Sequence, residues 1–214
     1  MPRKDVRGPK SVQTATGEIG GIELHQELLD RQAQAALVEE VRHLARAAPF
    51  QEQTTRRSQP LSVRMTSAGL FGWRSDRRGY RYEPHQPSGA AWPAIPPAIR
   101  AVWDRVVPEG TRAPESCLVN WYAPGARMGM HQDRDEGDMR QPVVSISLGW
   151  DALFRVGGLE RGGRTRSVWL RSGDVAVMGG AARLAHHGVD RIAEGAWTPL
   201  EASGRINLTL RVVT

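Results

Sequence analysis

A mainly β fold with flanking helices, of the α+β class, is the architecture that this sequence predicts, with a sandwich or jelly roll as its core. From Ser116 onward, short stretches of strand-forming residues recur at even spacing, and glycine-rich turns separate them. That pattern is typical of antiparallel sandwiches and jelly rolls. Two amphipathic helical segments come earlier in the chain, and we expect them to cover the outer face of one sheet. The length of 214 residues indicates one structural domain.

The first half of the chain contains the expected helices. Residues 1–20 have little apolar content and are expected to form a flexible tail. One helix should begin after Asp30, a good N-cap, and end before Pro49. Its apolar stripe consists of Ala33, Leu37, Val41, Leu44 and Ala48. Prolines 96 and 97 start a second helix, with the stripe Ile99, Val102, Trp103 and Val106.

The segment between these helices is less regular. We expect a polar loop over residues 51–60, a strand over residues 61–66 and a proline-rich linker over residues 90–97. Trp73 and Tyr80 lie among arginines at positions 74, 77, 78 and 81. Aromatic residues interleaved with arginines suit a surface that stacks bases and holds phosphates. A hairpin whose aromatics cap a small core has the same pattern, and the sequence by itself leaves both interpretations open.

The second half contains the expected strands of the β core. Alternation and β-branched residues place them at residues 117–122, 143–148, 152–156, 165–170, 174–178, 184–187 and 205–213. Glycine-containing turns lie between them, at residues 149, 157–158, 162–163, 172–173 and 179–180. No internal repeat is evident.

Composition limits the classes of function. The formal net charge is +6, from 29 Lys and Arg against 23 Asp and Glu, and nearly all the cations are arginine. This charge permits a polyanionic partner such as nucleic acid, but an arginine-rich genome would give it too. Cys117 is the only cysteine, which excludes an intramolecular disulfide and a cysteine-rich zinc site. Neither a signal peptide nor a membrane span is recognisable, so we expect a cytoplasmic protein. We also expect a monomer.

His131-Gln132-Asp133 is the motif around which the functional interpretation is built. In an extended segment, side chains two residues apart point to the same face, so the imidazole and the carboxylate could bind one metal ion. A third ligand must come from elsewhere, and the adjacent His186 and His187 are candidates. Two histidines and one carboxylate form the facial triad of non-haem Fe(II) oxygenases.

The last predicted strand strengthens this interpretation. Arg205, Asn207, Thr209 and Arg211 share one face of it, and the residues between them are apolar. Inward-facing arginines need anionic partners. A dicarboxylate could supply them, because each of its carboxylates can accept two parallel hydrogen bonds from one guanidinium. The alternative is a solvent-exposed polar face of an edge strand.

With these motifs in view, the chain resembles the AlkB family of Fe(II)- and 2-oxoglutarate-dependent dioxygenases, in particular its bacterial repair enzymes. The matching motifs, in order, are Asn120-x-Tyr122-x-Pro124-Gly125, His131-x-Asp133, Ser145-x-Ser147-Leu148-Gly149, Ser172-Gly173-Asp174, His187-Gly188 and Arg205-x-Asn207-Leu208-Thr209-x-Arg211. The resemblance implies a double-stranded β-helix core over residues 116–214. It also implies that residues 21–115 hold N-terminal helices and a nucleotide-recognition lid packed on that core.

The resemblance also implies the cofactor and its ligands. His131, Asp133 and His187 would bind Fe(II) as the catalytic centre, with His187 preferred to His186 because glycine follows the ligand in the family motif. Asn120, Tyr122 and Asn207 would hold 2-oxoglutarate. Arg205 would pair with its distal carboxylate, and Arg211 would lie near its keto-acid end.

The implied reaction is oxidative demethylation of 1-methyladenine and 3-methylcytosine in DNA, and whether RNA is also a substrate stays open. It consumes O2 and 2-oxoglutarate, hydroxylates the N-methyl group, and releases formaldehyde, succinate and CO2. The base must leave the stack. The residues expected to contact the substrate are Met65, Trp73, Tyr80, Arg134, Asp135, Glu136 and Arg161, with Asp135 preferred to Glu136 for the cationic edge of the base. Arg127 is a further candidate for a phosphate contact.

Two alternatives remain open at this point. Met178, where close bacterial relatives often have tryptophan, and the loop before Leu61 allow a 2-oxoglutarate oxygenase that acts on tRNA or on a protein side chain. A jelly-roll nucleic-acid-binding module without catalysis is the other alternative, although the intact triad and both arginines of the last strand oppose it.

Overall fold

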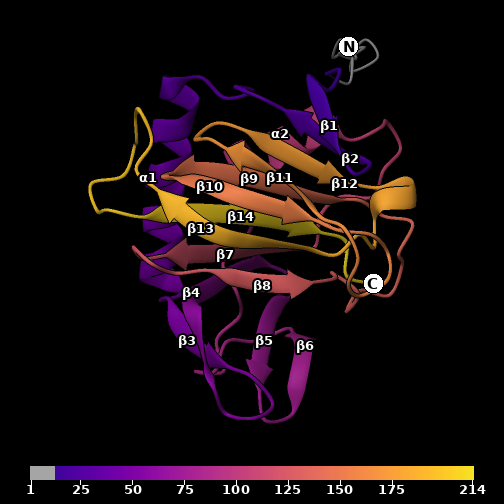
Figure 1. The fold of residues 1–214 in the computed structure, drawn as a ribbon. Helices are drawn as coiled ribbons and strands as arrows, with labels where there is room; N and C mark the ends of the chain where they lie inside the picture. Colours follow the sequence, from indigo (N-terminus) through magenta and orange to yellow (C-terminus); the bar gives the residue numbers. More distant parts are fainter. Residues whose placement is uncertain (1–12) are drawn as a thin grey trace, which may run out of the picture.

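Two antiparallel sheets and two helices make up most of the protein, whose computed structural model describes residues 13–214. The large sheet has the strand order β1-β2-β12-β9-β14-β7-β4-β3, and the small sheet has the order β11-β10-β13-β8 (Figure 1). A separate hairpin consists of β5 (Gly72–Asp76) and β6 (Gly79–Glu83). The two facing sheets are those of a double-stranded β-helix, so the predicted fold class is confirmed.

The large sheet combines both halves of the chain. Its strands are β1 (Gly17–Ile19), β2 (Ile22–His25), β3 (Gln51–Thr54), β4 (Pro60–Gly69), β7 (Ser116–Tyr122), β9 (Val143–Gly149), β12 (Val175–Met178) and β14 (Arg205–Arg211). The small sheet contains β8 (Met128–His131), β10 (Asp151–Val156), β11 (Arg166–Leu170) and β13 (His187–Ala193). Strands that precede residue 116 thus extend the large sheet at both edges.

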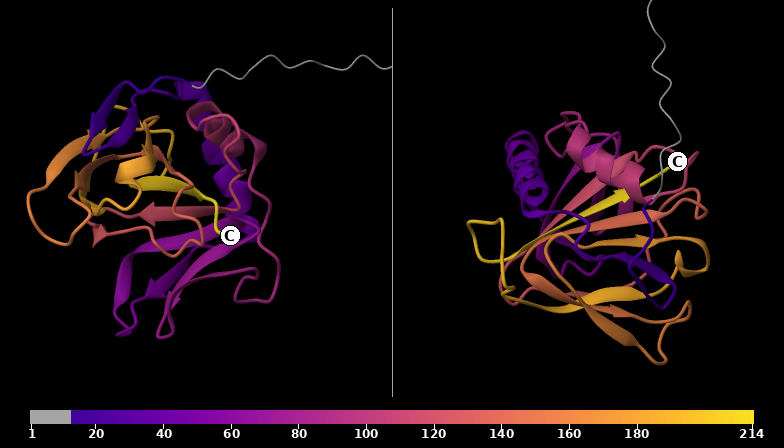
Figure 2. Two further views of the ribbon diagram at one scale, coloured as in Figure 1. Left: turned by 90° about the vertical axis from the view of Figure 1, so that its right-hand side faces the viewer. Right: turned by 90° about the horizontal axis from the view of Figure 1, so that it is seen from above.

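Both helices lie against one face of the large sheet (Figure 2). α1 (Arg31–Ala47) begins where Asp30 Oδ1 accepts a hydrogen bond from the Ala33 amide at 2.8 Å, as predicted for an N-cap. α2 (Pro97–Val106) begins at a proline. Their apolar stripes and the apolar face of the sheet form one core cluster. Within residues 13–214, no helix is both long and apolar enough to cross a membrane.

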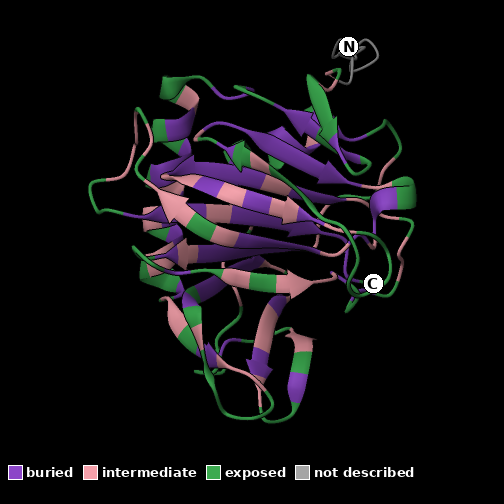
Figure 3. Cartoon of the chain, viewed as in Figure 1, coloured by how far each residue is buried: buried purple, intermediate pink, exposed green. Residues whose placement is uncertain are grey.

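Strand β14 separates the hydrophobic core from the site. Ile206, Leu208 and Leu210 belong to the core under the helices. Side chains alternate along a strand, so Arg205 and Arg211 point to the opposite face, toward the space between the two sheets. Figure 3 shows how completely the strands at the centre of the large sheet are buried. The predicted alternation along this strand is confirmed.

Four local predictions were wrong. Residues 51–54 form β3 rather than a loop, because backbone pairing with β4 holds this polar stretch in an extended conformation. Residues 17–19 form β1, so the predicted tail over residues 1–20 is not a tail at that end, and residues 1–12 lie outside the described part. The expected strand over residues 184–187 begins only at His187, because a 3-10 turn (Gly180–Ala182) and its hydrogen bonds precede it. β8 ends at His131, so Asp133 lies beyond the extended segment.

Candidate active site

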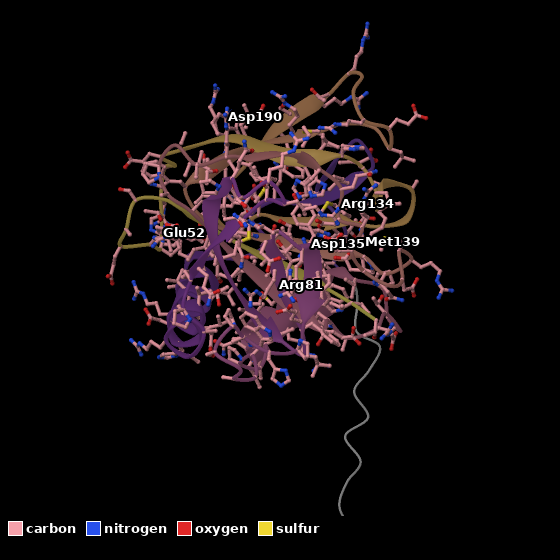
Figure 4. The ribbon with its side chains drawn as sticks, turned by 90° about the horizontal axis from the view of Figure 1, so that it is seen from below. Glu52, Arg81, Arg134, Asp135, Met139 and Asp190 are labelled. Atoms are coloured by element: carbon pink, nitrogen blue, oxygen red, sulfur yellow. The ribbon has the colours of Figure 1, made fainter. Side chains whose placement is uncertain are left out.

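A cavity of about 300 Å³ lies between the two sheets, and the hairpin β5–β6 contributes to its wall. Most residues that the sequence analysis selected line this cavity. They are Met65, Trp73, Tyr80, Asn120, Tyr122, His131, Asp133, Asp135, Glu136, His187, Arg205, Asn207 and Arg211. Arg134, labelled in Figure 4, and Arg161 are exposed and do not line the cavity. A phosphate contact outside the cavity stays a prediction for these two arginines.

Three side chains form a potential metal site in this cavity. Ligand atoms of His131, Asp133 and His187 all lie within 4.8 Å of one another. The strand pairing causes this arrangement, because His187 on β13 is the direct partner of His131 on β8. Asp133 Oδ1 is 3.7 Å from His131 Nε2, and its Oδ2 is 3.9 Å from His187 Nε2. His186, the other candidate, has Nδ1 3.1 Å from the carbonyl of Gly158 and is not part of this group.

Hydrogen bonds select the ring nitrogen that each histidine presents to the site. The Nδ1 atom of His131 is 2.9 Å from the Gly129 carbonyl, and that of His187 is 3.0 Å from the Ala185 carbonyl. A carbonyl oxygen can only accept, so each Nδ1 carries the proton and each Nε2 keeps its lone pair for a metal. Burial lowers the pKa of His187 to about 4, so its ring is neutral at pH 7.

Arg211 keeps Asp133 ionised inside the protein. Burial by itself would raise the pKa of the Asp133 carboxyl, but the positive charge of Arg211 and its hydrogen bond outweigh burial and hold that pKa below its usual range. Arg211 Nη2 donates to Asp133 Oδ2 at 2.8 Å, and Nε lies 3.3 Å from the same oxygen. A carboxylate in its charged form and two neutral imidazoles are the donor set that a divalent iron ion requires.

Glu136 belongs to the protein's own ion-pair network. Arg183 Nη2 lies 3.0 Å from its Oε2, while its Oε1 accepts from the Tyr82 hydroxyl at 2.5 Å and lies 3.3 Å from Arg211 Nε. Both carboxylate oxygens already have donors within the protein, and the expected contact between Glu136 and the substrate stays a prediction. Sequence reasoning did not select Arg183 or Tyr82, because neither lies in a periodic pattern or next to a ligand motif.

Arg205 lies at the other end of β14, and no carboxylate among residues 13–214 forms a direct ion pair with it, although the charges of Asp174 and Asp151 act on it. Its side chain is 1% exposed, and burial lowers its pKa to about 10. It donates to the Ser147 hydroxyl at 2.7 Å and to the backbone carbonyls of Trp150 and Leu170 at 3.1 and 3.4 Å. Within the part of the chain that the structure describes, its Nε has no hydrogen-bond partner. A buried guanidinium with an unused donor and no direct carboxylate contact within the described residues is suited to the carboxylate of a ligand.

Amide and hydroxyl groups lie between the two arginines. Asn207 Nδ2 donates to the Ser145 hydroxyl at 2.7 Å, and Asn120 Nδ2 lies 3.4 Å from Asn207 Oδ1. Burial raises the pKa of Tyr122 to about 12, so its hydroxyl keeps its proton and can donate. Two serines that interrupt the apolar strand β9, at positions 145 and 147, were the available signal for this polar wall.

Unpartnered buried atoms test whether 2-oxoglutarate suits this wall. Arg205 Nε, Arg211 Nη1 and Asn120 Oδ1 are buried without hydrogen bonds. Uncompensated buried polar atoms are uncommon and require an explanation. Two of these atoms are guanidinium donors that belong to Arg205 and Arg211 of one strand, and both residues line the same cavity. The residues present therefore fit a 2-oxoglutarate molecule placed beside a metal held by the triad.

Aromatic and acidic groups border the cavity on the hairpin side. The Trp73 and Tyr80 rings stack with centroids 5.4 Å apart, and Trp73 Nε1 donates to Asp135 Oδ2 at 3.2 Å. Asp135, labelled in Figure 4, is exposed. Aromatic faces beside a carboxylate suit a flat cationic ring. The segment is a hairpin whose aromatics line the cavity, and the role of Trp73 and Tyr80 in stacking bases stays a prediction.

Comparisons with known proteins agree with this geometry. Residues 21–211 match the family described as the 2OG-Fe(II) oxygenase superfamily. The chain is 50% identical over 206 residues to the alpha-ketoglutarate-dependent dioxygenase AlkB homolog of Caulobacter vibrioides, covering 96% of this chain and 93% of that protein. It is 39% identical over 179 residues to alpha-ketoglutarate-dependent dioxygenase AlkB of Escherichia coli K12, covering 82% of each chain.

Two further matches concern substrate class and fold. A DNA N(6)-methyladenine demethylase of Arabidopsis thaliana is 41% identical over 90 residues, which cover 42% of this chain and 26% of that protein. The solved structure of OsALKBH1 matches with a TM-score of 0.78 and 28% identity, covering 92% of this chain and 99% of that one. The double-stranded β-helix is therefore shared with a solved relative.

Proposed function

Because the chain belongs to the AlkB family within the 2OG-Fe(II) oxygenase superfamily, we propose that it demethylates N-alkylated bases in nucleic acid. Fe(II) is the metal, and 2-oxoglutarate and O2 are the cosubstrates. The preferred substrates are 1-methyladenine and 3-methylcytosine in DNA, and RNA is a further candidate. One observation carries the proposal: a His-Asp-His triad, a buried arginine that no carboxylate of residues 13–214 contacts directly, and an aromatic wall with a carboxylate line one cavity.

Each group of residues has a separate task in this proposal. His131, Asp133 and His187 hold the iron through two Nε2 atoms and a carboxylate. Arg205 holds the distal carboxylate of 2-oxoglutarate, while Asn120, Tyr122, Asn207 and Arg211 orient the rest of it. When bound, iron would use O2 and 2-oxoglutarate to hydroxylate the N-methyl group: one oxygen atom enters the methyl group, which leaves as formaldehyde, and the other enters succinate, which forms with CO2.

The hairpin side of the cavity orients the base. Trp73 presents an aromatic face, Tyr80 stacks beside Trp73, and Met65 lines the cavity. Asp135 is directed to the cationic edge of the methylated base, because its carboxylate is exposed and fixed by the Trp73 indole. A base that cannot pair is easier to extrude into such a pocket. Holding the methyl group beside the metal is the main contribution of the protein, which needs no general base of its own.

A lesion panel tests the proposed function. Purified protein with Fe(II), 2-oxoglutarate and air is incubated with oligonucleotides that carry 1-methyladenine or 3-methylcytosine in single-stranded DNA, duplex DNA and RNA. We expect formaldehyde and succinate in equal amounts, and a mass loss of one methylene per repaired base. Unmethylated oligonucleotides and the Asp133→Ala variant are the controls. Metal-loaded protein that releases no formaldehyde from any of these substrates would refute the proposal, and turnover on a peptide pool would redirect it.

The cellular context is a prediction from the sequence. We place the enzyme in the cytoplasm, where its nucleic-acid substrates are accessible. We expect it to act as a monomer. The free thiol of Cys117 is buried, which is compatible with a reducing compartment.

A further inference from the structure

Two side chains of the hairpin β5–β6 donate hydrogen bonds to the carboxylates of Asp135 and Glu136, which lie shortly after the metal ligand Asp133 in the chain. Trp73 and Tyr82 are direct partners in the hairpin ladder. Trp73 Nε1 donates to Asp135 at 3.2 Å, and the Tyr82 hydroxyl donates to Glu136 at 2.5 Å. Side chains of directly opposed residues lie on the same face of a hairpin. One face of the hairpin is therefore attached to a single short segment of the core, two and three residues beyond the metal ligand.

The Glu136 contact continues to the metal ligand through two arginines. Arg183 donates to the backbone carbonyl of Asp133 at 2.6 Å and lies 3.0 Å from Glu136. Arg211 binds the Asp133 side chain at 2.8 Å and lies 3.3 Å from Glu136. The backbone and the carboxylate of Asp133 are thus both held by cations that Glu136 also holds.

This network is buried and balanced in charge. The side chains of Arg183 and Glu136 are 3% and 2% exposed, and those of Arg211 and Asp133 are 7% and 9% exposed. Two carboxylates and two guanidinium groups together have no net charge. A buried ion is stable only when its partners have good geometry, so a displacement of Glu136 would change the positions of both arginines. The neutral hydroxyl of Tyr82 is the contact by which the hairpin joins this network.

We propose that Tyr82 is a positioning residue that couples docking of the hairpin to the order of the metal ligand Asp133, through Glu136, Arg183 and Arg211. Binding of metal and 2-oxoglutarate then stabilises the docked hairpin, and the docked hairpin strengthens their binding by the same factor. The base is consequently gripped by Trp73 and Tyr80 most firmly when the metal centre is complete. This inference rests on the metal site and the hairpin role of the proposed function, but not on the identity of the base.

Amide hydrogen exchange without turnover measures the coupling. The full-length protein is compared with and without Mn²⁺ and 2-oxoglutarate, in the absence of O2 and nucleic acid, and exchange is followed in the ladder amides of residues 72–83. In the wild type, we expect the ligands to slow this exchange by about 5-fold or more, within the range typical of allosteric coupling. In Tyr82→Phe, the slowing should fall to less than about 2-fold, because the hairpin has lost its bond to Glu136.

Two further variants separate this role from a general loss of structure. Tyr80→Phe is the matched control: it removes a hydroxyl from the same strand, and the coupling should survive. Glu136→Gln should remove the slowing of exchange by Mn²⁺ and 2-oxoglutarate to the same extent as Tyr82→Phe. The variant that carries both substitutions should lose no more of this slowing than either single variant. Thermal unfolding of Tyr82→Phe establishes that the variant is folded.

The outcomes distinguish this inference from the proposed function. The inference would be overturned if Mn²⁺ and 2-oxoglutarate did not slow amide exchange in the hairpin of the wild type. It would also be overturned if they slowed this exchange as much in Tyr82→Phe as in the wild type. Either result would leave formaldehyde release from methylated oligonucleotides unaffected as a test of function. Intact coupling in a protein that releases no formaldehyde would support the inference and refute only the proposed function.

Discussion

The guanidinium of Arg211 donates to the carboxylate of Asp133, with Nη2 2.8 Å from Oδ2. This bond joins the end of β14 to the segment after β8, so the last strand of the chain supports a metal ligand 78 residues earlier. It also explains how a carboxyl group that is 9% exposed keeps its charge. The ion pair therefore prepares the site before metal arrives.

Replacing Arg211 by Met should destabilise the metal-free protein. The substitution leaves Asp133 and Glu136 with fewer cations in a buried site, and breaking such a pair typically costs about 3–5 kcal/mol. Urea denaturation with a chelator present measures the free energy of unfolding. In an Asp133→Asn background the same substitution should cost less, because the charge that Arg211 compensates is gone. Equal losses in both backgrounds would show that the two side chains are not coupled.

The adjacent histidines provide a matched test of the metal site. His187→Ala should abolish stable Mn²⁺ or Fe(II) binding, because it removes one of three ligands. His186→Ala should retain the metal, since that ring lies beside the Gly158 carbonyl and outside the triad. Metal content after dialysis distinguishes the two variants. Retention of metal by His187→Ala, or its loss from His186→Ala, would require a different ligand set.

Arg205 should determine the requirement for 2-oxoglutarate. Arg205→Ala removes a charged donor from a shielded site, a loss of about 1.5–3 kcal/mol or roughly a ten- to hundred-fold rise in the concentration needed for half-maximal rate. Arg205→Lys keeps the charge but cannot donate two parallel hydrogen bonds to one carboxylate. Its requirement for 2-oxoglutarate should therefore lie between those of the wild type and Arg205→Ala. Initial rates at varied 2-oxoglutarate give the comparison. An unchanged requirement in Arg205→Ala would place the distal carboxylate elsewhere.

The metal-free protein should lose stability as the pH falls from about 6.5 toward 4. Burial lowers the pKa of His187 to about 4, whereas an unfolded histidine titrates near 6.5. Between these pH values the unfolded chain binds more protons than the folded protein, so the free energy of unfolding rises with pH. This rise is nearly complete above about pH 6.5. The difference for His187 between pH 5 and pH 7 should be about 2 kcal/mol. His187→Asn should show a correspondingly weaker pH dependence in chelator-treated urea titrations.

The sequence by itself determined the local features of this protein. Apolar spacing and capping placed both helices, because helical periodicity is written into the side chains that must be buried. Alternation along residues 205–211 separated a core face from a polar face. The spacing of His131 and Asp133 made them candidate ligands, and the resemblance to the AlkB family, rather than the pattern itself, favoured His187 over His186.

Only the tertiary structure decided the contacts between distant segments. Strand β3 is polar and is extended because β4 pairs with it, so its own residues contain no signal of a strand. The use of Glu136 by Tyr82, Arg183 and Arg211 depends on four segments meeting in one buried place. The local sequence indicates which side chains can be buried and which can be charged. The pairing of distant segments decides which partner each buried charge has. For that reason the metal triad could be predicted, and the network that positions it could not.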